Sequence, residues 1–327
     1  MPHPTLAPGN EQASFESIES VDPEQAARLL ADVMGGAYEA NVSEDLWRWK
    51  HCLNPAGRSL GLAAYSAERD LIALRPFMRW SLRRGTEPLA AARAIDTIVH
   101  PEWRRAGLFS ALTSESLAML ESERIGVVFN TPNKLSGPGY AKLGWRLLGH
   151  PTLWVRPRAP WRWNGELPGR VSSFSTEAVP VAEQTSGSLG AGISVWKSAE
   201  YLAWRYADHP TLTYFTVEVE GATGIVREDQ RFGRKGAALV DWLIASGQPA
   251  AFRRLLRAVL KACPGAYLVT GPLSRRGDHM VALSLGFVPV RWRNVQLAVR
   301  PIGAAKADEA LTDKQAWNLT LGDLESF

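Results

Sequence analysis

The residues best suited to chemistry gather in one stretch, from Ala94 to Phe109, where a strand runs into a basic loop and then a helix. Helix N-termini expose unpaired N–H groups and the positive end of the helix dipole, so they bind phosphate groups. Arg104 and Arg105 add positive charge, and Gly107 lets the backbone approach a ligand closely. The stretch is neither a Walker A loop nor a dinucleotide fingerprint, so an ordinary turn with two solvated arginines stays open from these residues alone.

In its context, this stretch resembles motif A of the GNAT superfamily of acyl-CoA N-acyltransferases. In that family a V-x-P-x-x-R/Q-x-x-G-x-G/A pattern binds the CoA pyrophosphate. Val99, Pro101, Arg104 and Gly107 match the pattern in register. Phe109 departs from it, because it stands where the family usually has Gly or Ala.

The segment after the next strand is similar to a second GNAT signature, N-x(n)-Y-x-K-x-G-F/W. Asn130 and Asn133 are followed by Tyr140-Ala-Lys-Leu-Gly-Trp145. The two motifs are specific as a pair and weak singly. Together they imply a site for an acyl-CoA, with acetyl-CoA as the expected co-substrate and no metal.

The resemblance also assigns roles to single residues. Tyr140 would be the general acid, since a phenol with a pKa of about 10 can protonate an alkyl thiolate whose thiol has a pKa of about 8.5. A packing tyrosine is the alternative. Asp96 would be a base or hold a water, but an equivalent Asp241 in the second half leaves a shared structural role equally open. The implied cofactor-binding residues are Ile98, Val99, Arg104, Arg105, Ala106, Gly107, Leu108, Phe109, Ser110 and Asn133.

Local patterns predict the elements that position these residues. The Asp22-Pro23 pair is typical of a helix start, and that helix should end near Met34. Apolar and β-branched runs predict strands at about 60–66, 71–81 and 89–99, and leucines at helical spacing predict a helix over 107–123. The second half repeats the order with a helix near Ser198, strands near 212–219, 222–227 and 236–245, a helix over 249–261, a strand over 266–270, a helix before Gly286 and a last strand.

Two pairs of similar sequence segments, which we call echoes, indicate an internal duplication. Residues 43–55 and 198–210 both run from a serine to a proline, and their triplets Trp47-Arg48-Trp49 and Trp204-Arg205-Tyr206 match 157 residues apart. Further on, residues 142–157 and 284–301 both contain a Leu-Gly-aromatic step and end in Val-Arg-Pro. The predicted fold is therefore α/β (α+β), with two GNAT-like domains in tandem, each a mixed central sheet flanked by helices. The expected divisions are a 1–157 domain with the acyl-CoA site, a 158–170 linker, and a 171–327 domain with a C-terminal tail.

The second domain is expected to be degenerate. The loop after the Asp241 strand, residues 246–249, has neither arginines nor the R-x-x-G spacing. Ala282 stands four residues before Gly286, where Tyr140 stands four before Gly144. The second domain should therefore bind no CoA.

Composition narrows the class of protein. The chain has 327 residues, 46% hydrophobic, with a formal charge of +4, which suits a soluble globular protein of about two domains. Its two cysteines and scattered histidines give no disulfide framework and no metal-ligand spacing. No apolar run is long enough to span a bilayer, and the N-terminus lacks a signal-peptide pattern, so we expect a cytoplasmic protein without a membrane partner. Its oligomeric state is left open.

The leading function is acyl transfer from acetyl-CoA, or another acyl-CoA, to a primary amine of a small molecule or sugar. One alternative is a Fem-type aminoacyltransferase, which is also a duplicated GNAT fold and takes its acyl group from aminoacyl-tRNA. Residues 151–327 carry 21 Lys and Arg against 16 Asp and Glu, which mildly favours tRNA, while the intact Arg104–Gly107 loop favours CoA. Otherwise no nucleic-acid partner is expected. A non-catalytic CoA-binding protein is a third possibility.

Overall fold

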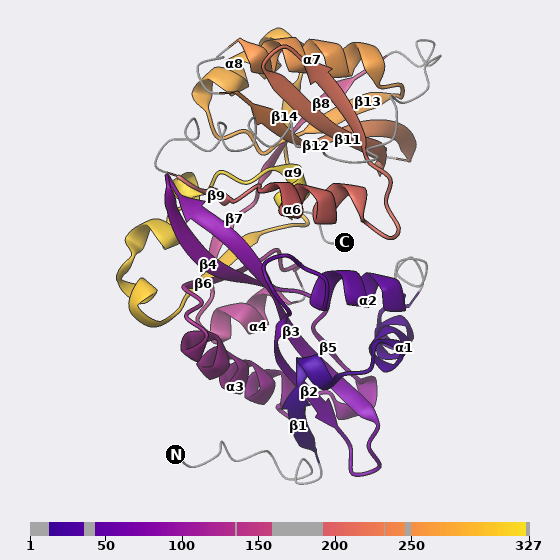
Figure 1. Cartoon of the computed structure of the whole chain (residues 1–327), viewed down its shortest axis with the longest axis vertical. Helices are drawn as coiled ribbons and strands as arrows, with labels where there is room; N and C mark the ends of the chain where they lie inside the picture. Colours follow the sequence, from indigo (N-terminus) through magenta and orange to yellow (C-terminus); the bar gives the residue numbers. More distant parts are fainter. Residues whose placement is uncertain are drawn as a thin grey trace.

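The computed structural model describes residues 13–35, 43–134, 136–158, 192–231, 233–245 and 250–324. Each of its two lobes is built on a mixed sheet with helices packed against it (Figure 1). The predicted α/β class with two mixed, helix-flanked sheets is therefore confirmed. Most of the predicted linker and the 246–249 loop lie outside the described ranges.

The first sheet follows the order β1-β2-β3-β4-β6-β15-β7, and β5 and β9 pair with β3. Among these described strands, only β4 and β6 are parallel neighbours. Its strands are β1 (Ser14–Ser17), β2 (Leu60–Tyr65), β3 (Leu71–Arg84), β4 (Glu87–Ala94), β5 (Ile98–Val99), β6 (Val127–Asn130), β7 (Arg146–Gly149), β9 (Ile193–Val195) and β15 (Leu297–Pro301).

The second sheet follows the order β10-β11-β12-β13-β8-β14, with β12 and β13 as its parallel pair. This sequence of antiparallel and parallel pairings matches the β2-β3-β4-β6-β15-β7 path of the first sheet. The match supports the duplication that the sequence echoes indicate. Its strands are β8 (Thr152–Pro157), β10 (Phe215–Val219), β11 (Ala222–Arg231), β12 (Arg234–Ile244), β13 (Tyr267–Thr270) and β14 (Val288–Arg291).

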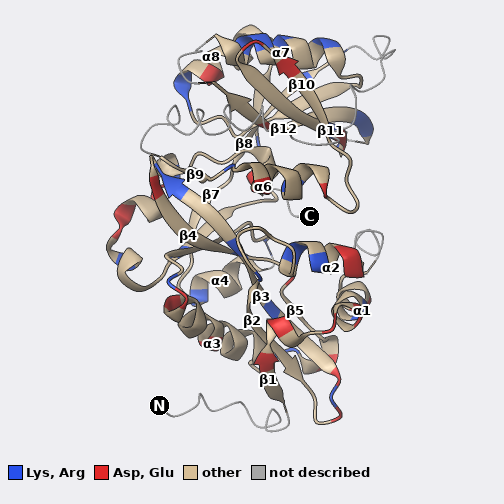
Figure 2. Cartoon of the chain, viewed as in Figure 1, with Lys and Arg blue, Asp and Glu red and all other residues tan. Residues whose placement is uncertain are grey.

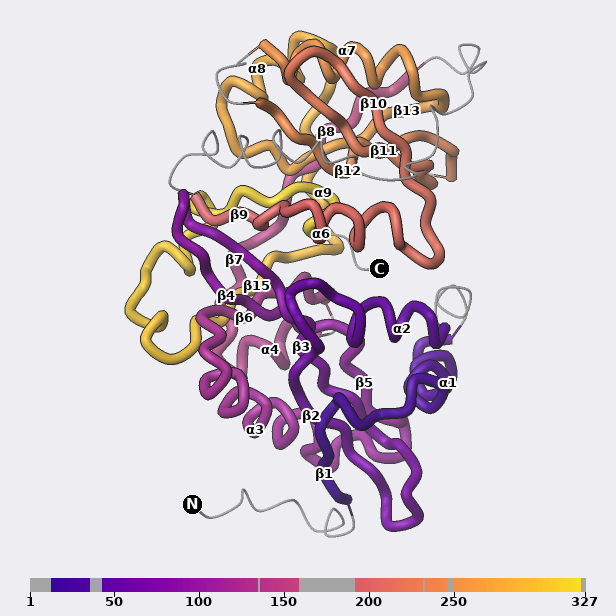
Figure 3. Tube along the Cα trace, viewed as in Figure 1, coloured from indigo at the N-terminus to yellow at the C-terminus, as the bar shows by residue number. Residues whose placement is uncertain are grey.

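The two sheets exchange one strand each. Strand β8 leaves the first half and lies between β13 and β14, while β15 leaves the second half and lies between β6 and β7. Figure 3 shows this as a magenta segment inside the orange lobe. A division of the chain at Pro157 therefore does not separate the two sheets. The two Val-Arg-Pro endings noticed in the sequence are the ends of these two exchanged strands.

The helices begin where their capping residues predict. The Asp22 carboxylate accepts hydrogen bonds from the amides of Glu24 and Gln25, and the Ser43 hydroxyl caps the next helix through the amide of Leu46. The helices are α1 (Pro23–Met34), α2 (Glu44–His51), α3 (Leu108–Ser122), α4 (Gly137–Lys142), α6 (Ala199–Leu202), α7 (Ala251–Ala262), α8 (Arg276–Ser284) and α9 (Leu321–Leu324).

The two halves meet at a reciprocal tryptophan pair. Trp49 Nε1–H donates to the carbonyl of Trp204 (2.8 Å), and Trp204 Nε1–H donates to the carbonyl of Trp49 (2.9 Å). Their rings stack with centroids 4.5 Å apart. The pair lies 155 residues apart, which corrects the 157-residue register in which Trp47 matches Trp204. A short aromatic–basic triplet can be aligned in two registers that differ by two residues. The capping residues Ser43 and Ser198, which are 155 residues apart, select the register seen in the structure.

Candidate active site

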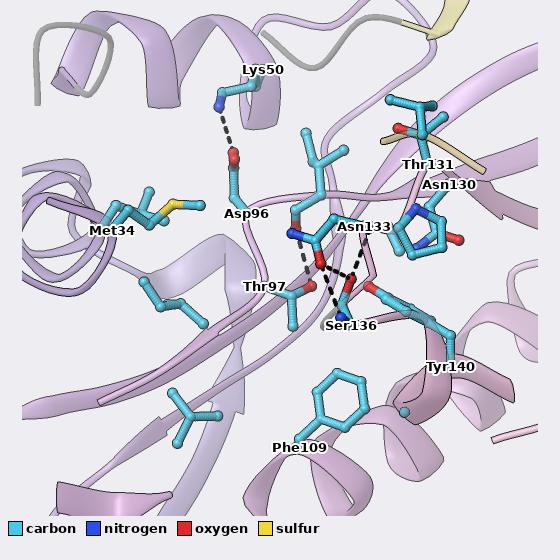
Figure 4. A pocket seen from close by; sticks show the side chains of 18 of the residues that line it. Met34, Lys50, Asp96, Thr97, Phe109, Asn130, Thr131, Asn133, Ser136 and Tyr140 are labelled. Carbon is cyan, nitrogen blue, oxygen red and sulfur yellow. Dashed lines mark hydrogen bonds and ion pairs between the residues drawn. The ribbon is translucent and has the colours of Figure 1, made fainter. Parts of the chain in front are cut away.

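A cavity of about 620 Å³ opens at the broken strand that β4 and β5 form together (Figure 4). The predicted residues Asp96, Ile98, Val99, Asn133 and Tyr140 all line it. The second half contributes to it as well. The other lining residues include Leu30, Met34, Ser43, Leu46, Trp47, Lys50, Thr97, Phe109, Asn130, Thr131, Ser136, Asn294 and Val295.

The break in the strand creates the cavity. Both β4 and β5 pair with β3, but the backbone between them turns at Asp96, whose φ is +47°. On its other edge β4 pairs with β6 only from Ala91 to Arg93, so β5 has no partner strand there among the described residues. Because the His100 amide donates back to β3, alternation turns the Val99 amide toward the open edge and the Ile98 amide toward β3.

The basic loop lies beside this cavity at the start of α3. Arg104 and Arg105 are exposed, and Gly107 occupies the N-cap position with φ +82° and no side-chain cap. The Leu108 side chain is buried in the core, so only its backbone can face a ligand, and the Phe109 ring reaches the cavity. The helix start thus offers backbone N–H groups and exposed cations in the segment between the cavity-lining residues Val99 and Phe109.

Tyr140 projects from α4 into the cavity. Asn133 and Ser136 fix the turn before this helix, since Asn133 Oδ1 accepts from the Ser136 amide (3.0 Å). Tyr140 is 5% exposed, and its ring meets Phe109 edge-on with centroids 5.8 Å apart. Figure 4 shows its hydroxyl turned toward the middle of the pocket. The phenol oxygen accepts a hydrogen bond from Arg75 Nη1 (3.3 Å).

Asp96 closes the other end of the pocket in an ion pair (Figure 4). Lys50 Nζ lies 2.6 Å from its carboxylate and His51 Nε2 lies 3.0 Å away. Burial alone would raise the pKa of Asp96, but the charge of Lys50 and the hydrogen bond from His51 outweigh it and hold the pKa well below its usual range. Burial lowers the pKa of His51 despite Asp96, so a neutral imidazole donates from Nε2 and accepts from Ser59 at Nδ1. An ionised carboxylate with such partners is a hydrogen-bond acceptor and a weak base.

Several residues of this site were not found from the sequence. Lys50 and His51 lie in the first echo, beside Trp49, and their counterparts Arg205 and Tyr206 lie in the second, so the repeat was the available signal. Arg75 lies in the apolar run 71–78, where a lone charged residue is itself a signal. Asn294 and Val295 gave no signal, because only the strand exchange brings their loop to this cavity.

The equivalent place in the second half is built differently. Asp241 is fully buried, and it accepts from Lys197 Nζ and from the Tyr206 hydroxyl (2.7 Å). Ala282, at the position that matches Tyr140, is buried in α8. None of Asp241, Lys197, Tyr206 and Ala282 lines the cavity of the first half.

The described residues contain no cluster of three or more His, Cys, Asp or Glu side chains able to hold a metal ion. Within the same ranges, no helix is both long and apolar enough to cross a membrane.

Residues 14–148 match the family model described as an acetyltransferase (GNAT) domain. No curated protein matches the chain.

Solved structures with the same fold cover most of the chain. A GCN5-related N-acetyltransferase from Anabaena variabilis has a TM-score of 0.64 at 15% identity, covering 91% of this chain and 75% of its own. A probable N-acyltransferase from Enterococcus faecalis has a TM-score of 0.61 at 14% identity, covering 89% and 73%. The N-myristoyltransferase of Saccharomyces cerevisiae with bound myristoyl-CoA has a TM-score of 0.58 at 11% identity, covering 90% and 84%.

The solved structures show that the chain shares the fold of N-acyltransferases, and the family match is to an acetyltransferase domain within it. The chain carries a GNAT domain over residues 14–148, in the lobe that holds the cavity.

Proposed function

We propose that this protein transfers an acetyl group from acetyl-CoA to a primary amine of a small molecule or sugar. The observation that carries the proposal is the broken strand β4–β5, which faces Tyr140 across one cavity and is joined by the basic loop to the uncapped start of α3. The second half is proposed to bind no CoA.

The start of α3 suits the CoA pyrophosphate. Its first amides and the exposed Arg104 and Arg105 supply N–H donors and positive charge to phosphate oxygens. From there the open edge of β5 leads into the cavity, where the Val99 amide is available to the pantetheine arm or the thioester oxygen. The same path brings the thioester toward Tyr140.

The transfer needs an attacking amine and a proton for the departing sulfur. The amine nitrogen forms a bond to the thioester carbon, the C–S bond breaks, and Tyr140 gives its hydroxyl proton to the thiolate. The proton lost by the amine returns to the phenolate through solvent. General acid catalysis of this kind contributes about 10²–10⁴-fold.

The inner end of the cavity suits a polar amine. The carboxamide oxygen of Asn130 is buried and has no hydrogen-bond partner within the described chain, so it is an open acceptor for an N–H group. The ionised Asp96 is a second acceptor. The Thr131 hydroxyl and the Asn294 carboxamide can form hydrogen bonds with the hydroxyl groups of a sugar. We therefore favour an acceptor that carries several hydrogen-bonding groups.

Transfer from aminoacyl-tRNA is the competing function. Figure 2 colours several positions of α7 blue for Lys and Arg, and the sequence of this helix, AFRRLLRAVLKA, supplies three arginines and a lysine. That helix belongs to the second lobe and contributes no residue to the cavity. The motif A loop at the cavity favours CoA.

The test is to incubate the purified protein with acetyl-CoA and a panel of amines and amino sugars while following free thiol. Thiol release that depends on an amine supports the proposal, and calorimetric titration should give one CoA per chain. CoA binding without release under any amine would indicate a non-catalytic protein. Failure to bind CoA, with activity on aminoacyl-tRNA, would establish the competing function.

A further inference from the structure

A buried arginine lies directly behind Tyr140. Arg75 is 0% exposed on β3, and its Nε and Nη1 atoms donate to the hydroxyls of Thr113 (2.8 Å) and Thr97 (2.7 Å). No carboxylate of the described chain forms an ion pair with it. Its Nη2 atom is buried without a hydrogen-bond partner.

A buried cation without a carboxylate partner lowers the stability of the fold, so its presence calls for a functional reason. An unpaired buried ion carries a desolvation penalty of several kcal/mol, and an apolar side chain of similar volume is often as stable or more stable there. Burial lowers the pKa of Arg75, and Tyr140 partly opposes this, but a guanidinium stays charged in proteins. The rings of Phe77 (4.3 Å), Phe109 (5.2 Å) and Tyr140 (5.3 Å) recover part of the penalty through cation–π contacts.

Two hydrogen bonds of Arg75 reach cavity-lining residues: one to the Thr97 hydroxyl and one to the Tyr140 oxygen. A guanidinium has only donors, so the phenol hydrogen cannot point at Arg75 and must point elsewhere. The hydroxyl faces the pocket, so this hydrogen is left for a ligand there (Figure 4). Once the proton is given away, the phenolate oxygen lies next to a cation in a site of low dielectric constant, where the attraction is strong.

We propose that Arg75 is a positioning residue for the transfer: it directs the Tyr140 hydroxyl proton toward the thioester sulfur and balances the phenolate that remains. This inference rests on the proposed role of Tyr140 as the general acid. In the balanced step, the C–S electron pair goes to sulfur, sulfur takes the phenol proton, and the negative charge moves from sulfur to the oxygen beside Arg75.

A double-mutant cycle tests the proposal, using wild type, Arg75→Met, Tyr140→Phe and the double variant. Arg75→Met should lower kcat about tenfold or more with CoA affinity close to wild type, and in the Tyr140→Phe background it should change kcat less than about twofold. Arg75→Lys, which keeps the charge without the fork, should retain part of the activity. Arg79→Met is the matched control: Arg79 is on the same strand but pairs with Glu123 at the surface, so kcat should stay unchanged.

The outcomes separate the two proposals. If Tyr140→Phe is near wild type, the acid assignment fails, and the inference about Arg75 fails with it. If Tyr140→Phe is slow but Arg75→Met is near wild type, or if the two losses multiply, only the inference about Arg75 is overturned. Thermal unfolding should find Arg75→Met at least as stable as wild type. If the Arg75→Met variant does not fold, the cycle is run with Arg75→Lys instead. A loss of kcat caused by Arg75→Lys that persists in the Tyr140→Phe background would then reject the proposal.

Discussion

The two sheets have the same order of pairings, but they differ at the strand that carries the ion-paired aspartate. In the first, the strand that carries Asp96 breaks into β4 and β5, and the carboxylate side chain is 17% exposed in a cavity. In the second, β12 runs unbroken from Arg234 to Ile244, and Asp241 is fully buried among Lys197, Tyr206 and the neighbouring α9. Both sheets thus contain a carboxylate that is bound by a lysine and by a second residue from a preceding helix, His51 for Asp96 and Tyr206 for Asp241. The break in the strand is what opens one copy to a ligand.

This comparison suggests a division of roles. The Asp–Lys pair is an architectural feature of both halves, whereas Tyr140, Gly107 and the free edge of β5 belong to the first half alone. Changes at the shared features should therefore alter stability in both halves. Changes at the features found only in the first half should alter binding or rate.

The largest expected effect is on the chemical step. Tyr140→Phe should lower kcat by about 10²–10⁴-fold with CoA affinity near wild type, because the ring stays and only the proton is lost. Tyr206→Phe is the control in the second half: it removes a hydroxyl bonded to Asp241, and it should lower stability without a comparable loss of kcat. A Tyr140→Phe enzyme within about threefold of wild type would remove the acid role, since that loss is below the lower edge of the range.

The paired carboxylates should show the next largest effect. Asp241→Asn removes the nearer of the two carboxylates that face the buried Lys197 and leaves only Asp323, 3.7 Å away, so it should reduce the free energy of unfolding by up to about 3–5 kcal/mol. Asp96→Asn should reduce it less, because the Asp96 side chain is 17% exposed, whereas that of Asp241 is fully buried, and the Lys50–Asp96 pair lines the cavity. Denaturant unfolding measures both, and a larger loss for Asp96→Asn would contradict the comparison.

The pH dependence of the two pairs should run in opposite directions. The pKa of Asp96 is depressed in the folded protein, so its contribution is complete above about pH 4 and is lost as the pH falls further. Burial alone would lower the pKa of Lys197, but the charges of Asp241 and Asp323 raise it. Its contribution is therefore complete below about pH 10 and is lost as the pH rises through the folded-state value. Unfolding at several pH values, for wild type and each variant, checks both signs.

A smaller effect is expected at the phosphate loop. Gly107→Val puts a β-branched residue at φ +82°, so the loop should change shape and CoA affinity should fall about tenfold or more. No atom lies within 4 Å of the new Cβ position, so the protein should stay folded. Gly85→Val, at a hairpin with φ +57° and equally open space, imposes the same kind of strain away from the site. Equal CoA affinity for the two variants in a titration would argue against the motif A assignment.

The smallest effect should be found at the junction of the halves, and it should be symmetric. Trp49→Phe and Trp204→Phe each remove one buried N–H donor and its hydrogen bond to the carbonyl of the other tryptophan, at about 0.5–1.5 kcal/mol of stability each. Trp196, which is 40% exposed, is the control, and Trp196→Phe should be within about 0.5 kcal/mol of wild type. Unequal losses for Trp49 and Trp204 would break the proposed equivalence of the two repeats.

The sequence determined the local features of this protein, because their causes lie within a few residues. Asp22 caps the helix that it was expected to start, and the leucine spacing predicted α3 to within about a turn. The family motifs led to Gly107 and Tyr140, and simple counting found Ala282 at the matching position in the second half.

The tertiary structure decided what depends on chain-distant partners. Lys50 and His51 meet Asp96 only because α2 packs against the end of β4, and Arg75 is brought behind Tyr140 by the sheet. Asn294 and Val295 reach the cavity only because β15 crosses into the first sheet. Periodicity and capping describe how a residue relates to its neighbours in the chain. They do not specify which strand edge it will pair with, because that choice is made by burial and hydrogen bonding across the whole molecule.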